Sequence, residues 1–205
     1  MSSIAVTGEA GGRLRPERYS EAQRRTIDAT MALFAELGVK GTSFSLIAER
    51  VGVTKAAIYH QFKSKDAIVL AVAEVGLAPL EDALDEAEAQ NSTERARAVL
   101  LKRVIDLAVA RRRWINALQN DPVMVQLLAT HDPFLDLMTR VYGILLGVDD
   151  GPAERMRIAI VSAAIGAAIV HPLVADLDDE SLRSELLAVT RQLFDIDDDH
   201  GDSPG

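Results

Sequence analysis

The sequence predicts an all-α protein, and three observations support this prediction. Apolar residues recur at helical spacing through most of the 205 residues. Capping residues, glycines and prolines mark where successive helices begin and end. No segment shows the strict alternation of apolar and polar residues that a half-buried strand requires.

The first predicted helix has clear signals at both ends. Ser20 and Gln23 form a capping box, and Gly38 is a typical helix stop. Between these signals the apolar residues Ile27, Met31, Phe34 and Leu37 repeat at helical spacing. Residues 1–19 are polar and glycine-bearing, which predicts a flexible N-terminal arm.

Three further helices are predicted before residue 80. Ser43 caps Phe44 to Val51, Thr54 caps Lys55 to Gln61, and Ser64 caps a helix that begins at Lys65. Gly52 separates the first two of these helices. Pro79 is expected to kink or end the third.

The rest of the chain continues in the same pattern. Helices are expected from Asn91 or Ser92 to Arg111, over Trp114 to Leu118, from Pro122 to Leu128, from Pro133 to Leu146, from Pro152 to Ala175, and from Asp178 to Phe194. Residues 158–170 are apolar on nearly every face, so this helix should be sandwiched between others. It either forms a bundle between subunits with the last helix or belongs to the core of one protomer.

Composition and charge limit the possible functions. The chain has no cysteine, which excludes disulfides, thiolate metal sites and a cysteine nucleophile. Its net charge is −9, yet residues 1–70 hold ten Lys and Arg against seven Asp and Glu, so a basic module precedes an acidic body. There is no signal-like apolar segment, and the longest apolar run is too short to span a membrane. We expect a soluble, cytoplasmic protein without a membrane partner.

Residues 47–62 meet the requirements of a helix-turn-helix. Ala48 supplies the small side chain needed where two helices cross, and Gly52 permits a positive φ in the turn. The expected inner face consists of Ile47, Val51, Val53 and Ile58. A plain helical hairpin without a DNA-binding role is the alternative interpretation.

The flanking residues are more specific. Gly41-Thr42-Ser43, Ile47-Ala48, Gly52-Val53-Thr54-Lys55 and Tyr59-His60-Gln61-Phe62-Lys63-Ser64-Lys65 together resemble the N-terminal signature of the TetR family of transcriptional regulators. The resemblance covers about residues 20–75, and Ala56 departs from it where the family often has glycine. It implies a three-helix DNA-binding domain joined through a fourth helix to a helical ligand-binding and dimerisation domain.

This resemblance divides the chain into four parts. We expect a flexible arm over residues 1–19, a helix-turn-helix DNA-binding domain over 20–64, a ligand-binding and dimerisation domain over 65–195, and a disordered acidic tail over 196–205. Because each chain has one DNA-reading helix, a homodimer on a palindromic operator is expected.

Candidate DNA contacts lie around the third helix. Lys55 and Ala56 are expected to enter the major groove, the first to donate to guanine and the second to contact a thymine methyl group. The phosphate candidates are Thr42, Thr54, Tyr59, His60 and Lys65. Thr42 and Thr54 have the alternative role of helix caps alone. Arg13, Arg15 and Arg18 form either a minor-groove arm or a solvated tail.

The middle helices contain candidates for a small hydrophobic effector. The residues considered are Trp114, Leu118, Met124, Leu128, Phe134, Met138 and Tyr142. Such a mixture suits an apolar ligand, although an ordinary core has the same composition. No catalytic or metal-ligating constellation is found, and no cofactor is expected.

The predicted function is therefore a ligand-responsive transcriptional regulator. The resemblance implies a repressor that a small molecule releases from DNA. The alternative is a helical protein-interaction module with weak, non-specific DNA binding.

Overall fold

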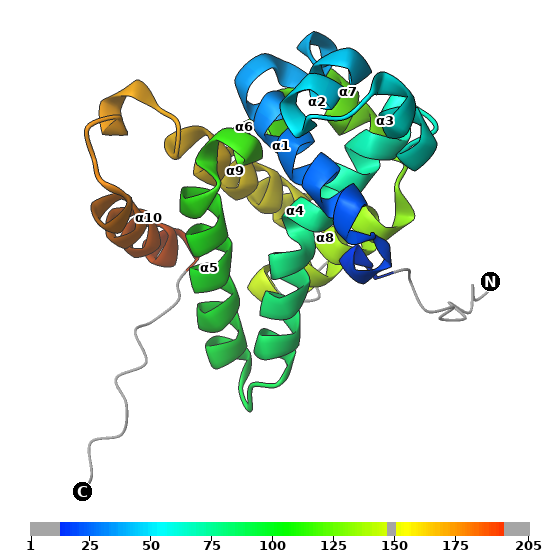
Figure 1. The fold of residues 1–205 in the computed structure, drawn as a ribbon. Coiled ribbons are helices and arrows are strands. Elements are labelled where there is room, and N and C mark those ends of the chain that lie inside the picture. The colour runs from blue at the N-terminus through cyan, green and yellow to red at the C-terminus, as the bar shows by residue number, and fades with distance from the viewer. Residues whose placement is uncertain (1–12, 147–150, 195–205) are drawn as a thin grey trace, which may run out of the picture.

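The computed structural model describes residues 13–146 and 151–194, and within these ranges it contains ten α-helices and no strand, which confirms the all-α prediction (Figure 1). The predicted acidic tail, the first part of the arm and most of the predicted turn before residue 152 lie outside these ranges. The helices are α1 Glu21–Gly41, α2 Phe44–Val51, α3 Lys55–Gln61, α4 Lys65–Glu88, α5 Thr93–Ala110, α6 Arg112–Asn120, α7 Pro122–Leu128, α8 Asp132–Leu146, α9 Pro152–Ala168 and α10 Asp179–Phe194, with 3-10 turns η1 Pro16–Arg18 and η2 Pro172–Val174. None of the described helices is long and apolar enough to cross a membrane.

The predicted signals of the first helices are confirmed. Ser20 and Gln23 form the capping box of α1, and Ser43, Thr54 and Ser64 each accept a hydrogen bond from a backbone N–H in the first turn of the next helix. Gly38 has φ 70° and kinks α1, which continues for one more turn to Gly41. Gly52 ends α2 with φ 78°, the left-handed conformation that glycine adopts without a steric cost.

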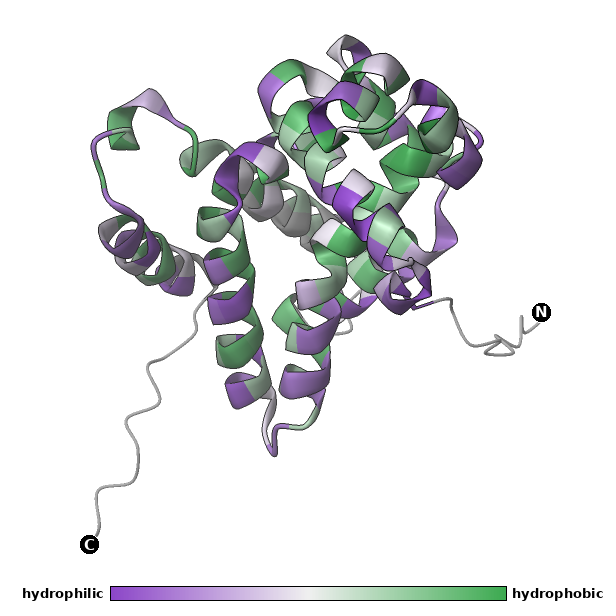
Figure 2. Cartoon of the chain, viewed as in Figure 1, coloured by the Kyte–Doolittle hydropathy of each residue, from purple (hydrophilic) through white to green (hydrophobic). Residues whose placement is uncertain are grey.

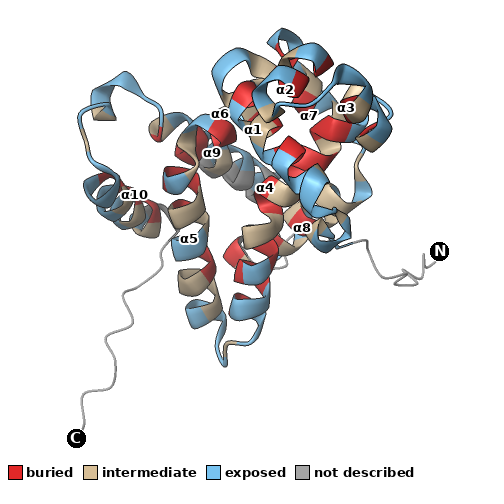
Figure 3. Ribbon diagram, viewed as in Figure 1, coloured by how far each residue is buried: buried red, intermediate tan, exposed pale blue. Residues whose placement is uncertain are grey.

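The inner face of the helix-turn-helix agrees with the prediction except at Val53. Ile47, Ala48 and Ile58 are buried, as is Phe62. Val51 is half-buried, whereas Val53 is 40% exposed. Val53 follows the left-handed glycine, so its side chain leaves the inner face at the turn. Figure 3 shows buried residues where α1 to α4 meet, and further ones along α4 and α5.

α4 connects the helix-turn-helix to the rest of the molecule, and Pro79 does not end it. The helix runs through Pro79 to Glu88 and packs along α5. Proline leaves a carbonyl in the preceding turn without its usual donor. Nearby, the Arg111 Nη1 donates to the Gly76 carbonyl at 3.1 Å. The hydrophilic residues of the α4–α5 hairpin gather toward its tip (Figure 2).

The apolar helix over residues 158–170 differs from its prediction in two respects. α9 ends at Ala168 rather than Ala175, and the short turn η2 follows. Ile165 and Ile169 are buried, but Met156 and Ile160 are 61% and 60% exposed. Within one protomer, α9 is therefore packed on one side only and is not sandwiched.

Residues 13–19 pack against α4, in contrast to the flexible arm that we predicted. The Leu14 side chain is buried, and its backbone N–H donates to Glu81 Oε1 at 3.1 Å. Arg18 Nη2 lies 2.7 Å from Glu74 Oε2. Arg13 and Arg18 are therefore paired with α4 carboxylates and do not belong to a solvated tail. These contacts could not be predicted from local sequence signals, because Glu74 and Glu81 are more than fifty residues away from their partners along the chain.

Candidate functional site

The first candidate site is the exposed side of α3. Thr54, Lys55, Ala56, Tyr59 and His60 are all exposed there, while Ile58 on the opposite side is completely buried. The Thr54 hydroxyl accepts from the Ala57 N–H at 3.1 Å, so its role as a cap is confirmed. This arrangement leaves the N-terminus of a short helix and its polar side chains facing solvent.

Ring contacts hold the side chains of this face in place. The rings of Tyr59 and Phe44 meet edge to face with centroids 4.6 Å apart, and Tyr59 remains 48% exposed. The Lys55 ammonium lies 5.8 Å from the Tyr59 ring centroid, within the range of a cation–π interaction. α2 thus supports Tyr59, and Tyr59 supports Lys55.

Thr42 does not belong to this exposed face. Its side chain is buried, and its hydroxyl donates to the Gly38 carbonyl at 2.9 Å. The prediction of a phosphate contact through this hydroxyl is therefore corrected, since it is used inside the fold. Lys65 is half-buried at the first position of α4, where Ser64 caps the helix.

One nearby cation is already paired. Arg50 Nη2 lies 2.9 Å from Glu36 Oε2, and its hydrogen bonds hold the pKa of the Glu36 carboxyl below its usual value. Arg50 is therefore a weaker candidate for a DNA contact than the α3 residues.

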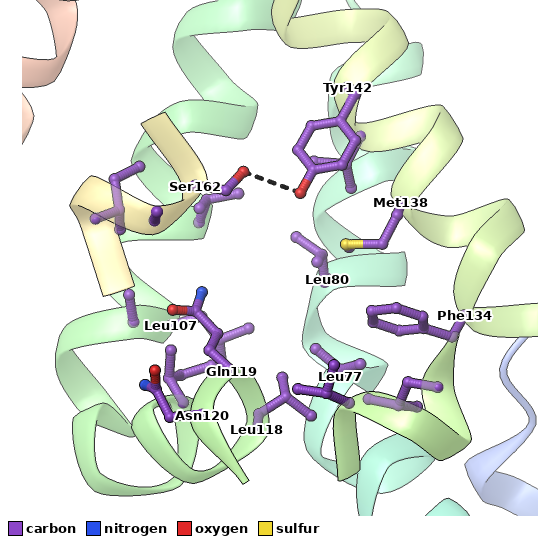
Figure 4. A pocket seen from close by; sticks show the side chains of 18 of the residues that line it. Leu77, Leu80, Leu107, Leu118, Gln119, Asn120, Phe134, Met138, Tyr142 and Ser162 are labelled. Atoms are coloured by element: carbon purple, nitrogen blue, oxygen red, sulfur yellow. Dashed lines mark hydrogen bonds between the residues drawn. The ribbon is translucent and has the colours of Figure 1, made fainter. Parts of the chain in front are cut away.

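The second candidate site is a cavity of about 600 Å³ between α4, α5, α6, α7, α8 and α9 (Figure 4). Five predicted ligand residues line it: Leu118, Leu128, Phe134, Met138 and Tyr142. The structure brings these five together although they come from three helices. The volume of the cavity and its mainly apolar walls are typical of a small-molecule site.

Two predicted ligand residues, Trp114 and Met124, belong instead to the core. Met124 is completely buried, and Trp114 is 3% exposed. The Trp114 ring packs against Gly76 of α4 so closely that a Cβ there would lie 2.2 Å from its Cζ2 atom. Aromatic and methionine residues at helical spacing do not reveal from sequence which of them face a cavity.

Three walls of the cavity were not predicted from the sequence. α4, α5 and α9 contribute Leu77, Leu80, Val104, Leu107, Ala108, Ser162, Ala163, Ile165 and Ala167. These are aliphatic or small residues, which are equally typical of helix packing. Small residues such as Ser162 and Ala163 of α9 leave space for the cavity.

Polar groups occur at two places in the cavity wall. The hydroxyl groups of Tyr142 and Ser162 are hydrogen-bonded at 2.9 Å, which joins α8 to α9. Gln119 and Asn120 contribute carboxamides from α6.

Two buried carboxylates, Glu74 and Glu81, lie on α4, which is one of the helices that line the cavity. Glu74 is 3% exposed and contacts Arg18, the Tyr19 hydroxyl and His131, whose Nε2 is 3.4 Å from Glu74 Oε1. Burial, followed by hydrogen bonding to Glu74, raises the pKa of Tyr19 to about 12. Glu81, two turns further on, accepts from Arg140 of α8 at 2.9 Å.

Asp121 connects the cavity helices to α1. Its Oδ2 accepts from the Val39 N–H at 2.8 Å, and its Oδ1 accepts from the Val123 N–H at 2.9 Å and so caps α7. The neighbouring Asn120 lines the cavity. A displacement of the α6–α7 junction therefore reaches the C-terminal end of α1 directly.

These features define a helix-turn-helix protein with a separate internal cavity. The family model for bacterial regulatory proteins of the tetR family matches residues 27–72. This match confirms the resemblance of the N-terminal segment to the TetR family.

Two curated relatives each align with about a quarter of the chain. One is the uncharacterised HTH-type transcriptional regulator YerO of Bacillus subtilis (strain 168), 38% identical over 55 residues. The other is the HTH-type transcriptional regulator AcrR of Shigella flexneri, 39% identical over 49 residues. The alignments cover 27% and 24% of this chain but only 19% and 23% of those proteins.

The likeness extends further in structure than in sequence. The transcriptional regulator FadR from Bacillus subtilis, solved in complex with stearoyl-CoA, has 18% identity and a TM-score of 0.59 over 81% of this chain and 96% of that chain. At this identity the likeness shows a shared fold.

Proposed function

We propose that this protein is a ligand-responsive transcriptional regulator, a repressor that binds a palindromic operator as a homodimer and is released by a small hydrophobic molecule. The observation that carries the proposal is the connection of two sites by one helix. α4 begins four residues after the last residue of α3, and further along it contributes Leu77 and Leu80 to the cavity wall.

The DNA contacts follow from the exposed face of α3. We propose that Lys55 and Ala56 contact bases, while Thr54, Tyr59, His60 and Lys65 contact phosphates. The proposed DNA-binding domain is residues 20–64, and the proposed effector and dimerisation domain is residues 65–195. A DNA target implies that the protein acts in the cytoplasm.

The exposed apolar residues support a homodimer. Met156 and Ile160 of α9 and Val189 of α10 are each more than half exposed in one protomer. Covering them with a second copy would remove apolar surface from water. A two-fold dimer would present two α3 helices to the two halves of a palindrome.

Release requires that the effector prefer one arrangement of the protein over another. An effector that contacts α4 and α8 would shift α4, and with it the spacing of the two α3 helices. The contact from Asp121 to Val39 is a second connection through which the cavity reaches the DNA-binding domain.

Selection of bound genomic DNA fragments at near-physiological salt tests the proposal. We expect a palindromic sequence to be enriched, with two protomers bound to each fragment. Salt-sensitive retention without sequence enrichment would contradict it and favour a protein-interaction module with weak DNA binding.

A further inference from the structure

The cavity wall has the character of a hydrocarbon-binding surface. Leu77 and Leu80 of α4, Leu107 of α5 and Leu118 of α6 lie around it, and Phe134 and Met138 of α8 extend this surface (Figure 4). Transfer of a hydrocarbon from water to such a wall is favourable in proportion to the apolar area that is buried. The greater part of the ligand is therefore apolar.

The polar groups of the wall are uncharged hydrogen-bonding groups. The Tyr142 and Ser162 hydroxyls, 2.9 Å apart, face one end of the cavity, and the Gln119 carboxamide lies nearer the other (Figure 4). Gln119 fits against Gly166 of α9, where a Cβ would lie 1.5 Å from its Oε1 atom. The missing side chain at residue 166 makes the space for this carboxamide.

Two arginines near the cavity are engaged elsewhere. Arg140 of α8 binds Glu81 and Glu88 at 2.9 Å each, on the side of α8 that faces the end of α4. Arg111 donates to the Gly76 carbonyl. Among the described residues that line the cavity, none is charged. A carboxylate placed there would lose its hydration without gaining an ionic partner from these residues.

We infer that the effector is an uncharged amphiphile, with a hydrocarbon body and one hydroxyl or carbonyl group that hydrogen-bonds to Tyr142 and Ser162. A hydroxyl group both donates and accepts, so the Tyr142 hydroxyl can donate to the ligand oxygen while it accepts from Ser162. This inference rests on the proposed function, because it takes the cavity to be the effector site.

Binding of four compounds with the same chain length tests the inference. The full-length protein is titrated calorimetrically, at slightly alkaline pH, with dodecan-1-ol, methyl dodecanoate, dodecanoic acid and dodecanoyl-CoA. We expect both uncharged compounds to bind at least about 10-fold more tightly than dodecanoate, since a buried charge without a partner is costly. Tighter binding of dodecanoate or dodecanoyl-CoA, or no binding of either uncharged compound, would overturn the inference.

Three variants test the recognition of the polar group. Loss of one hydrogen bond in Tyr142→Phe or Ser162→Ala is expected to weaken dodecan-1-ol binding about 3- to 10-fold. Thr139→Ala is the matched control, because it removes an exposed α8 hydroxyl that bonds to the Leu135 carbonyl outside the cavity. Equal affinities of all three variants and the parent would show that the hydroxyl pair does not bind the ligand, provided that thermal unfolding shows them folded.

Failure of this inference can be distinguished from failure of the proposed function. Enrichment of a palindrome together with preferential dodecanoate binding would refute the uncharged ligand alone. Tight dodecan-1-ol binding without any enriched DNA sequence would refute the regulator and leave a binding protein for uncharged amphiphiles.

Discussion

We propose that Lys55 of α3 contacts a base, whereas Lys65 of α4 contacts a phosphate. Lys55 is exposed at the first position of the helix and lies against the Tyr59 ring, whereas Lys65 begins α4. The caps that fix these positions were predictable, since each depends on residues within three positions along the chain. The burial of Thr42 was not predictable, because it depends on how α1 continues beyond Gly38.

Replacement of these two lysines is expected to have different effects. Lys55→Ala should relax base preference at one position of each half-site, with a loss of about 1–3 kcal/mol on the operator. Lys65→Ala should weaken binding to all sequences and lower the slope of log affinity against log salt by about one. Titrations of operator and random DNA at several salt concentrations measure both effects. Equal losses for Lys55→Ala on the two DNAs would contradict its assignment.

Tyr19 gives the fold a specific pH dependence. Its pKa is raised to about 12 from the model-compound value of 10.0, so the folded state favours the neutral phenol. A group with a raised pKa contributes stability that is fully present below its unfolded pKa and is lost as the pH rises through its folded pKa. The contribution of Tyr19 should therefore fall between about pH 10 and pH 12.

Comparison with Tyr19→Phe isolates this contribution from those of other groups. The difference in free energy of unfolding between the parent and the variant should shrink across that interval. Urea unfolding at a series of pH values measures it. A difference that stays constant with pH would show that the phenol does not titrate with the raised pKa.

Features that depend on contacts between helices could not be predicted from the sequence. The helix starts marked by a capping side chain were correct because such signals are local, whereas α6, which has no side-chain cap, begins two residues before the predicted Trp114. The continuation of α4 past Pro79 depends on contacts with α5 and the segment after it. The aliphatic residues of α4 and α5 that line the cavity cannot be distinguished in sequence from residues of a packed core. Five of the seven predicted ligand residues do line the cavity, because α8 and its neighbours carry aromatic and methionine side chains there.

The contact between α4 and α6 leaves no room for a larger residue at Gly76. A Cβ there would lie 2.2 Å from Trp114 Cζ2, and Trp114 is buried in the core. Gly76→Ala should lower the free energy of unfolding by about 1–3 kcal/mol, as expected for overpacking.

Gly143→Ala is the matched control for this substitution. Gly143 is exposed within α8, and an added Cβ would have no neighbour within 4 Å. Alanine should leave the stability unchanged or raise it by up to about 1 kcal/mol through its higher helix propensity. Denaturant unfolding measures the free energy of unfolding of both variants. Equal changes in the two would contradict the steric explanation.

We expect the whole protein to bind its operator only as a homodimer. A charge at the exposed apolar side of α9, as in Ile160→Asp, should prevent the second copy from packing there. We expect its mass in light scattering to be that of one 22.2 kDa chain, with much weaker operator binding.

Leu135→Asp is the comparison for this prediction. Leu135 is also exposed, at 42%, but lies on α8 and outside the cavity lining. The Leu135→Asp variant should have the same mass in light scattering as the parent protein. A dimeric Ile160→Asp variant would exclude this side of α9 as the interface.

The attachment of residues 13–19 to α4 has a practical consequence for shortened forms of the protein. The family match begins at residue 27, so a chain trimmed to Ser20 retains the whole matched segment. It would nevertheless lose Arg18 and Tyr19 from the buried Glu74 and the Leu14 amide from Glu81. The Arg18 side chain is about half exposed, so solvent screens this pair and its loss costs less than that of a fully buried pair, although Glu74 stays buried. Trimming at the boundary that sequence similarity suggests would thus yield a chain prone to proteolysis and aggregation.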